Sequence, residues 1–123
     1  MKNKLLLTAL LVLAPATALH AMTVGTFLEK ADALQKRGVT ALFSADFRLL
    51  KSEVKGASEA LRSERLAAQR AGRRAAYCPP DRPSLNSDEI LAYFRSIPAP
   101  QRNRTEVRDA LRGLLARKYP CAS

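Results

Sequence analysis

Apolar residues recur three or four positions apart along most of this chain, which is the period of an α-helix that buries one face. No segment alternates apolar and polar residues in the way a half-buried strand does. In the first helical segment, residues 23–38, the apolar face comprises Val24, Phe27, Leu28, Ala31 and Leu34. Thr26 and Glu29 have the spacing of a capping box, and Gly38 suits the end of the helix. The sequence therefore predicts an all-α domain.

A second, longer helix is predicted over residues 44–72. Its apolar seam is spaced by fours and threes and comprises Phe43, Phe47, Leu50, Val54, Ala57 and Leu61. The seam stops there because Glu64 and Arg65 occupy the next turn, so the last third of the helix should be only partly buried. We interpret Phe43 and Phe47 as core residues and not as part of a cofactor site.

A proline-rich loop, residues 72–85, precedes a third helix that has clear start signals. Asn86 is the predicted N-cap, and Glu89 completes a capping box with it. Leu85 and Ile90 have the positions of a hydrophobic staple.

The third helix continues its apolar face through Leu91 and Phe94 and ends at the prolines of residues 96–100. A fourth helix is predicted to start at an N-cap formed by Thr105. Its core face comprises Val107, Leu111, Leu114 and Leu115. The prediction is therefore a small four-helix domain.

The first 21 residues, MKNKLLLTALLVLAPATALHA, have the three regions of a secretory signal peptide. Lys2 and Lys4 precede an apolar run of about ten residues, which is too short to span a bilayer that needs roughly 20. An uncleaved anchoring helix is the alternative interpretation. Cleavage is expected after Ala21, with Ala18 as the alternative site, because the helical pattern begins just beyond Ala21.

The mature protein would then be a single domain, residues 22–123, exported to a bacterial periplasm and without an integral membrane segment. In an oxidising compartment Cys78 and Cys121, the only cysteines, are most simply a disulfide. No His/Cys metal site is expected, because the only histidine, His20, lies in the signal peptide. The bridge would close a loop of about 43 residues, contribute up to roughly 4 kcal/mol, and tie the end of the last helix to the central loop.

The net charge of +10, of which +8 remains without Lys2 and Lys4, favours an anionic partner. Acidic proteins, phospholipid head groups, polyanionic envelope polymers and nucleic acids all fit that description. The chain has no tryptophan and few other aromatic residues, which argues against binding nucleic acid by base stacking. We therefore expect no nucleic-acid partner.

Arginines form two groups. The first, at the end of the second helix and in the loop, comprises Arg62, Arg65, Arg70, Arg73, Arg74 and Arg82; the second comprises Arg104, Arg108 and Arg112. Each group is also consistent with a solvated face that contacts nothing. We favour the first group, because the disulfide and the prolines would order its loop before binding. The candidate partner-binding residues are Arg70, Arg73, Arg74, Tyr77 and Arg82, with the guanidinium groups pairing with carboxylates of a protein partner.

Catalysis is not expected. The mature chain has no histidine, its cysteines would be oxidised, and no glycine-rich phosphate loop occurs. Asp88 and Glu89 form a carboxylate pair, but negative charge in a first helical turn is explained by the helix dipole. We therefore expect no enzyme activity, catalytic residue, cofactor or metal.

The second half of the chain resembles the C-terminal half of the Rap/Tai family of periplasmic immunity proteins. The matching features occur in order over about 45 residues: Cys78 in a loop, the capped helix 86–94, the Ile97-Pro98 turn, and the ending Tyr119-Pro120-Cys121. Typical members carry a further cysteine pair and a glycine-aromatic motif in the first half. This chain has GASEALRSE, residues 56–64, where such a motif would fall.

The family protects bacteria against peptidoglycan amidase effectors delivered by type VI secretion. The resemblance thus implies an inhibitor that occludes a cell-wall amidase, with residues 70–82 docking at the mouth of its active-site cleft. The alternative is an envelope-binding module that holds anionic lipid or polymer through the same arginines. Whether the protein forms a homodimer stays open.

Overall fold

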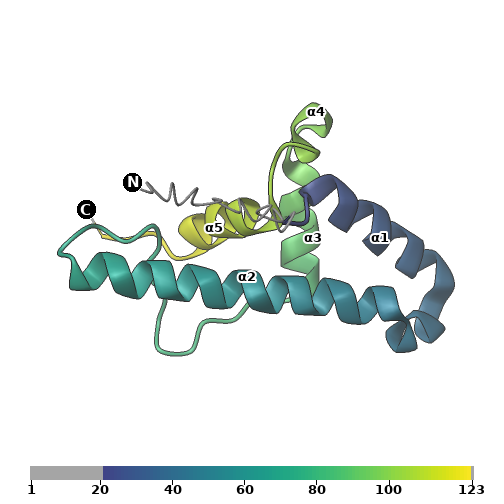
Figure 1. Ribbon diagram of the computed structural model, residues 1–123, viewed down its shortest axis with the longest axis horizontal. Coiled ribbons are helices and arrows are strands. Elements are labelled where there is room, and N and C mark those ends of the chain that lie inside the picture. Colours follow the sequence, from purple (N-terminus) through teal and green to yellow (C-terminus); the bar gives the residue numbers. More distant parts are fainter. Residues whose placement is uncertain (1–20, 123) are drawn as a thin grey trace, which may run out of the picture.

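The computed structural model describes residues 21–122, in which all regular structure is helical (Figure 1). The elements are α1 (Val24–Arg37), the 3₁₀ segment η1 (Gly38–Phe43), α2 (Ala45–Arg70), α3 (Ser87–Ser96), α4 (Ala99–Arg102) and α5 (Val107–Lys118). The all-α class is thereby confirmed. Four of the helices are the predicted ones, and α4 is an additional single turn. Residues 1–20 of the predicted signal peptide, with its alternative cleavage site after Ala18, lie outside the described residues.

Helix α2 runs most of the length of the molecule, and the other long helices lie to one side of it in this view (Figure 1). Both α1 and α5 pack against α2, and α3 packs against α1 and α5. The α1–α3 contact centres on Phe27 and Phe94, whose rings meet edge to face with centroids 5.2 Å apart. The predicted core faces of α1 and α5 are buried throughout. One apolar core therefore joins the three helices to α2.

The starts of α1 and α5 are joined by two backbone hydrogen bonds. The N–H of Val24 donates to the carbonyl of Thr105 at 2.8 Å, and the N–H of Val107 donates to the carbonyl of Met22 at 2.9 Å. This isolated bridge holds Thr23 in an extended conformation, where its Oγ1 accepts from the N–H of Thr26 at 3.2 Å. The predicted capping box of Thr26 and Glu29 is therefore wrong, because the helix starts earlier and Thr23 is its cap.

The predicted Thr105 cap of the last helix is also wrong. Glu106 occupies the N-cap position of α5 and makes no side-chain capping bond. Thr105 instead donates its hydroxyl to the carbonyl of Gln101 at 2.9 Å, closing the turn that follows α4. The unpredicted turn competes for the Thr105 side chain, and the bridge to Met22 satisfies the N–H of Val107.

Phe43 is the third correction, because its side chain is 84% exposed and not in the core. Ser44, in an extended conformation, caps α2 by accepting a hydrogen bond from the N–H of Phe47 at 3.1 Å. This cap interrupts the helical spacing, so Phe43 does not share the α2 seam. The seam is otherwise as predicted: Leu50, Ala57 and Leu61 are buried, and Phe47 and Val54 are partly buried against the core.

The end of α2 and the start of α3 follow the predictions closely. Gly38 and Gly72 are the two described glycines with positive φ, each 66°, and each lies just beyond a helix. Helix α2 ends at Arg70, two residues short of the predicted end. In α3 the capping box is confirmed, since Asn86 Oδ1 accepts from the N–H of Glu89 at 2.9 Å and Glu89 Oε2 accepts from the N–H of Asn86 at 3.0 Å.

Candidate binding surface

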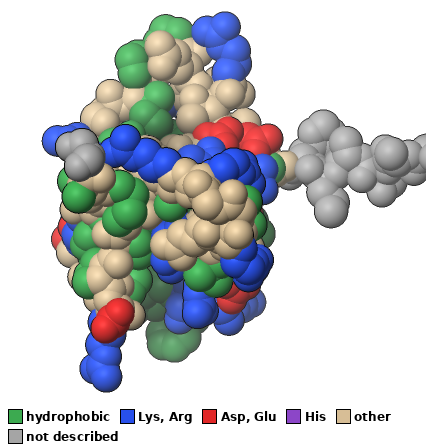
Figure 2. Space-filling model, turned by 90° about the vertical axis from the view of Figure 1, so that its left-hand side faces the viewer, with side chains coloured by type: hydrophobic (Ala, Val, Ile, Leu, Met, Phe, Trp, Pro, Cys, Tyr) green, Lys and Arg blue, Asp and Glu red, His purple; other side chains and the backbone are tan. Residues whose placement is uncertain are grey.

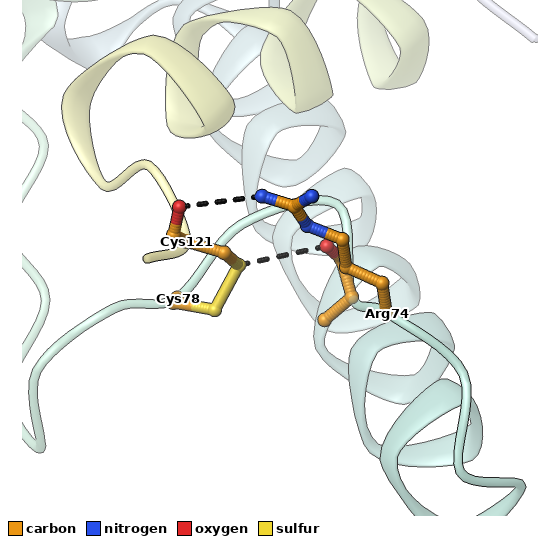
Figure 3. Close-up of a disulfide and its surroundings, with 4 residues drawn as sticks. Arg74, Cys78 and Cys121 are labelled. Atoms are coloured by element: carbon orange, nitrogen blue, oxygen red, sulfur yellow. Dashed lines mark hydrogen bonds between the residues drawn. A yellow bond between two sulfur atoms is a disulfide. The ribbon is translucent and has the colours of Figure 1, made fainter. Parts of the chain in front are cut away.

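The loop after α2 is held at its middle by the predicted disulfide between Cys78 and Cys121, which the structure contains (Figure 3). The N–H of Cys78 also donates to the carbonyl of Tyr119 at 2.8 Å. Arg74 reaches across from the loop, with a guanidinium nitrogen 3.5 Å from the carbonyl oxygen of Cys121 (Figure 3). Cys121 Sγ lies 3.5 Å from the carbonyl oxygen of Ala75, which is a contact only, because a disulfide sulfur carries no proton. The chain end is thus fixed to the loop.

A second attachment lies six residues further on, at Ser84. The hydroxyl of Tyr119 accepts from the N–H of Ser84 at 3.1 Å and lies 3.2 Å from its carbonyl oxygen. Lys118 Nζ donates to the same carbonyl at 2.7 Å. The hydrogen bond from the Ser84 backbone lowers the pKa of Tyr119. Residues 79–83, with sequence PPDRP, are therefore attached to the chain end on both sides, and we call them the proline arch.

A groove of about 690 Å³ lies between the proline arch and α2. Its apolar lining includes Val54, Leu85, Ile90 and Leu115, and its polar lining includes Glu59, Arg62, Arg65 and Asp81. A smaller hollow of about 350 Å³ lies beside it, lined by Leu61, Arg73, Ala76 and neighbouring residues of α2. Arg65 and Tyr77 line both spaces. The two hollows therefore share a wall, and together we call them the depression, which is lined by apolar side chains, its apolar floor, and by arginines.

Arg65 is the central side chain of this depression. Its guanidinium carbon lies 5.7 Å from the centroid of the Tyr77 ring, the range of a cation–π contact. Its Nε is buried and has no hydrogen-bond partner among the described residues. A buried donor without a partner costs free energy, and an acceptor supplied by a bound molecule would remove that cost.

The five predicted site residues divide into two kinds. Arg70 at the end of α2, Arg73 and Arg74 just beyond it, and Arg82 in the proline arch all lie exposed. Tyr77 does not, since it is 5% exposed and belongs to the core. The ring of Tyr77 contacts the guanidinium of Arg65 of α2 and belongs to the core cluster, so the structure gives it a packing position and not a surface one.

The arginines at the end of α2 and in the loop beyond it form no ion pairs among the described residues, although Glu59 and Asp81 line the same groove. Within residues 21–122, none of the six arginines 62, 65, 70, 73, 74 and 82 lies within salt-bridge distance of an acidic side chain. We call this set the arginine-rich end. Figure 2 views the molecule from this side, where Lys and Arg side chains occur in several places among apolar and neutral ones.

The competing arginines near α5 are differently placed. Arg112 pairs with Glu64 at 2.9 Å and with Asp109 at 2.7 Å, and these hydrogen bonds raise its pKa. Arg108 lies 3.9 Å from Glu106, and Arg104 donates to the carbonyl of Pro100 at 3.3 Å. Two of these three charges are thus already compensated within the fold, which leaves the arginine-rich end as the stronger candidate.

Sequence reasoning grouped Arg62 and Arg65 with this cluster but did not place them among the contact residues. The available signal was the position of Arg65, four residues after Leu61, where the apolar seam of α2 should have continued. A charged residue at a position where an apolar seam would continue can lie at the edge of a groove as readily as at the end of the core.

The arrangement suits recognition of carboxylate or phosphate groups by guanidinium forks. Among the described residues no group of three or more His, Cys, Asp or Glu side chains could hold a metal ion. No described helix combines the length and apolar character needed to cross a membrane. No protein-family model, no curated protein and no solved structure matches this chain.

Proposed function

We propose that this chain is a periplasmic helical binding protein of the immunity type, which occludes a peptidoglycan amidase effector. The observation that carries the proposal is the double attachment of the loop, through Cys78 and through Ser84, to the last residues of the chain. A loop ordered before binding loses little conformational entropy on association. The resemblance of residues 78–121 to the Rap/Tai family supports the choice of partner.

An occluding inhibitor needs a rigid projection that is complementary to the mouth of a cleft, and it needs no catalytic group. The proline arch supplies the projection, and the arginines of the depression supply the charge complementarity. Arg62, Arg65 and Arg73 would pair with carboxylates of the partner, while the apolar floor would exclude water and strengthen those pairs. The bound inhibitor would then occupy the mouth of the cleft and leave no room for substrate.

The test is protection of growing cells. Bacteria that export a type VI peptidoglycan amidase to their periplasm should survive when they also make this chain. Arg73→Glu with Arg74→Glu should abolish protection and weaken binding to the purified amidase by more than about 30-fold, since reversed charges in an interface repel the partner carboxylates. Folding should survive, because both side chains are exposed and exposed substitutions change stability by about 0.5 kcal/mol at most.

The matched control is Arg104→Glu with Arg108→Glu, which makes the same charge change on the competing surface. Arg112 is unsuitable as a control because its pair with Glu64 links α5 to α2, while its pair with Asp109 lies within α5. If the control loses protection and the loop variant keeps it, the working surface is near α5. If wild-type protein protects against none of these amidases but binds anionic polymer in a salt-sensitive manner, the envelope-binding alternative replaces the proposal.

A further inference from the structure

The corner between α1 and α2 lies at the opposite end of the molecule from the arginine-rich end (Figure 1). It carries large apolar side chains that are exposed. Val39 is 80% exposed, Leu42 56% and Phe43 84%, all within η1, and Leu49 in α2 is 44% exposed. We call these four residues the apolar corner. Among the described residues they are the large hydrophobic side chains that the fold leaves outside.

The corner is ordered although its side chains point outward. Ala41, 5% exposed, anchors η1 in the core. Ser44 donates its hydroxyl to the carbonyl of Ala41 at 2.7 Å, and Arg48 donates to the carbonyl of Phe43 at 3.2 Å. Thr40 donates its hydroxyl to the carbonyl of Arg37 at 3.0 Å. The exposed side chains are therefore held on a fixed backbone.

Basic residues flank the apolar corner along the chain. Lys36 and Arg37 precede η1, while Arg48 and Lys51 follow it on α2, and all four are exposed. No acidic side chain of the described residues lies within salt-bridge distance of any of them. The neighbouring carboxylate, Asp46, is already paired with Lys30 at 3.2 Å. The corner thus combines an apolar tip with an uncompensated positive rim.

We infer that the apolar corner inserts into the surface of an anionic phospholipid bilayer. Its apolar tip would enter the boundary between head groups and acyl chains, and its basic rim would lie at the level of the anionic head groups. A protein partner fits this surface less well, because a stable protein interface uses roughly 20–30 residues on each side. The corner offers four large apolar side chains on a projecting end of the molecule.

This membrane contact goes beyond the proposed function and does not depend on it. Helix α2 separates the apolar corner from the arginine-rich end by the length of the molecule (Figure 1). A protein bound by its corner would therefore keep the proline arch and the depression free for a partner in the aqueous phase. Inhibition and membrane contact can be measured separately.

The experiment is a flotation assay with vesicles of phosphatidylglycerol and phosphatidylcholine. The protein is used as cells secrete it, and mass analysis determines its N-terminus. Leu42→Ser with Phe43→Ser should reduce partitioning at least about tenfold, because the apolar tip is removed. Lys36→Gln with Arg37→Gln should also reduce it at least about tenfold, since each basic residue at an anionic surface contributes roughly fivefold. Vesicles of phosphatidylcholine alone should bind the wild type at least about tenfold more weakly.

The matched control is Arg73→Gln with Arg74→Gln, which removes the same charge from the other end and should change partitioning by less than about threefold. The inference is overturned if the Leu42/Phe43 variant floats like wild type, or if the control loses as much as the Lys36/Arg37 variant. It is also overturned if sedimentation shows that the wild type is a dimer and the Leu42/Phe43 variant a monomer, while both bind vesicles equally. Amidase protection by the Leu42/Phe43 variant should equal that of wild type, which separates this test from that of the proposed function.

Discussion

Glu89 joins the start of α3 to the end of α5 through one carboxylate. Its Oε2 accepts from the N–H of Asn86, and its Oε1 accepts from Lys118 Nζ at 2.6 Å. The hydrogen bond from Lys118 lowers the pKa of Glu89, with the backbone bond of Asn86 acting in the same direction, and Glu89 in turn raises the pKa of Lys118. The start of α3 is thereby fastened to the end of α5, next to the residues that hold the proline arch.

Glu89→Gln tests this contact through its pH dependence. Because the folded-state pKa of Glu89 is depressed, its charge stabilises the fold above the ordinary carboxyl value of 4.5, and this stabilisation is lost as pH falls through the lowered value. The free energy of unfolding of wild type should therefore exceed that of Glu89→Gln at neutral pH, and the difference should vanish in acid. Urea unfolding from about pH 7 to about pH 3 measures it.

The control for this series is Asp88→Asn, which removes a neighbouring carboxylate that has no cationic partner among the described residues. In Glu89→Gln, the glutamine side chain can still accept the capping hydrogen bond. The comparison of wild type with this variant therefore isolates the effect of the charge. A constant difference between wild type and Glu89→Gln at every pH would show that the contact with Lys118 contributes nothing through ionisation.

At the scale of single residues, the predictions succeeded where the interaction is local. The capping box of Asn86 and Glu89 is complete within four residues, so the sequence specifies it without knowledge of the fold. Thr26 and Thr105 were assigned wrongly because the true start of each helix is set by the bridge between residues 23 and 106, which lie far apart in the chain. Tyr77 is buried in the structure, and the sequence could not reveal this because an aromatic in a loop can face either a partner or the core.

At the scale of elements, α2 should differ in stability along its length. Its seam is covered up to Leu61, whereas Arg65 lines two open hollows and the following turn is largely exposed. Hydrogen exchange should therefore show strong protection around Leu50 and Val54 and much weaker protection from Arg65 to Arg70. Uniform protection to Arg70 in the isolated monomer would contradict this gradient.

The long helices were predictable because each buries a face that repeats over several turns. Segments of one or two turns carry no such repeat, which is why η1 and α4 were missed. The consequence was large only at Phe43, where a residue that fits the α2 spacing lies before the Ser44 cap and faces solvent.

At the scale of the whole molecule, the disulfide should be a main source of stability. Closing a loop of 43 residues contributes up to roughly 4 kcal/mol, and each kcal/mol shifts the melting temperature of a domain this size by about 4–8 °C. Reduction, or Cys78→Ser with Cys121→Ser, should lower the melting temperature by about 10–20 °C. Calorimetry measures the shift, and two free thiols in non-reduced exported protein would refute the bond itself.

The candidate surface was only partly predictable from sequence. The cysteine count and the predicted export indicated the first attachment of the loop, the disulfide between Cys78 and Cys121. The clustering of positive charge indicated the candidate residues Arg70, Arg73, Arg74 and Arg82. The second attachment, between Tyr119 and Ser84, involves residues 35 apart that carry no recognisable pattern. The apolar corner was hidden for a similar reason, because exposure of Val39 and Phe43 depends on where a 3₁₀ turn ends.

The bridge between Met22 and Val107 has a consequence for how the protein is made. A chain is synthesised from its N-terminus, yet α1 is fastened at its start by residues near the beginning of α5, and Cys78 pairs with Cys121. Helix α5 also supplies fully buried Val107 and Leu111. The native core therefore cannot be complete until the last helix has been synthesised, and a chain that is still open is the state that the predicted export would require.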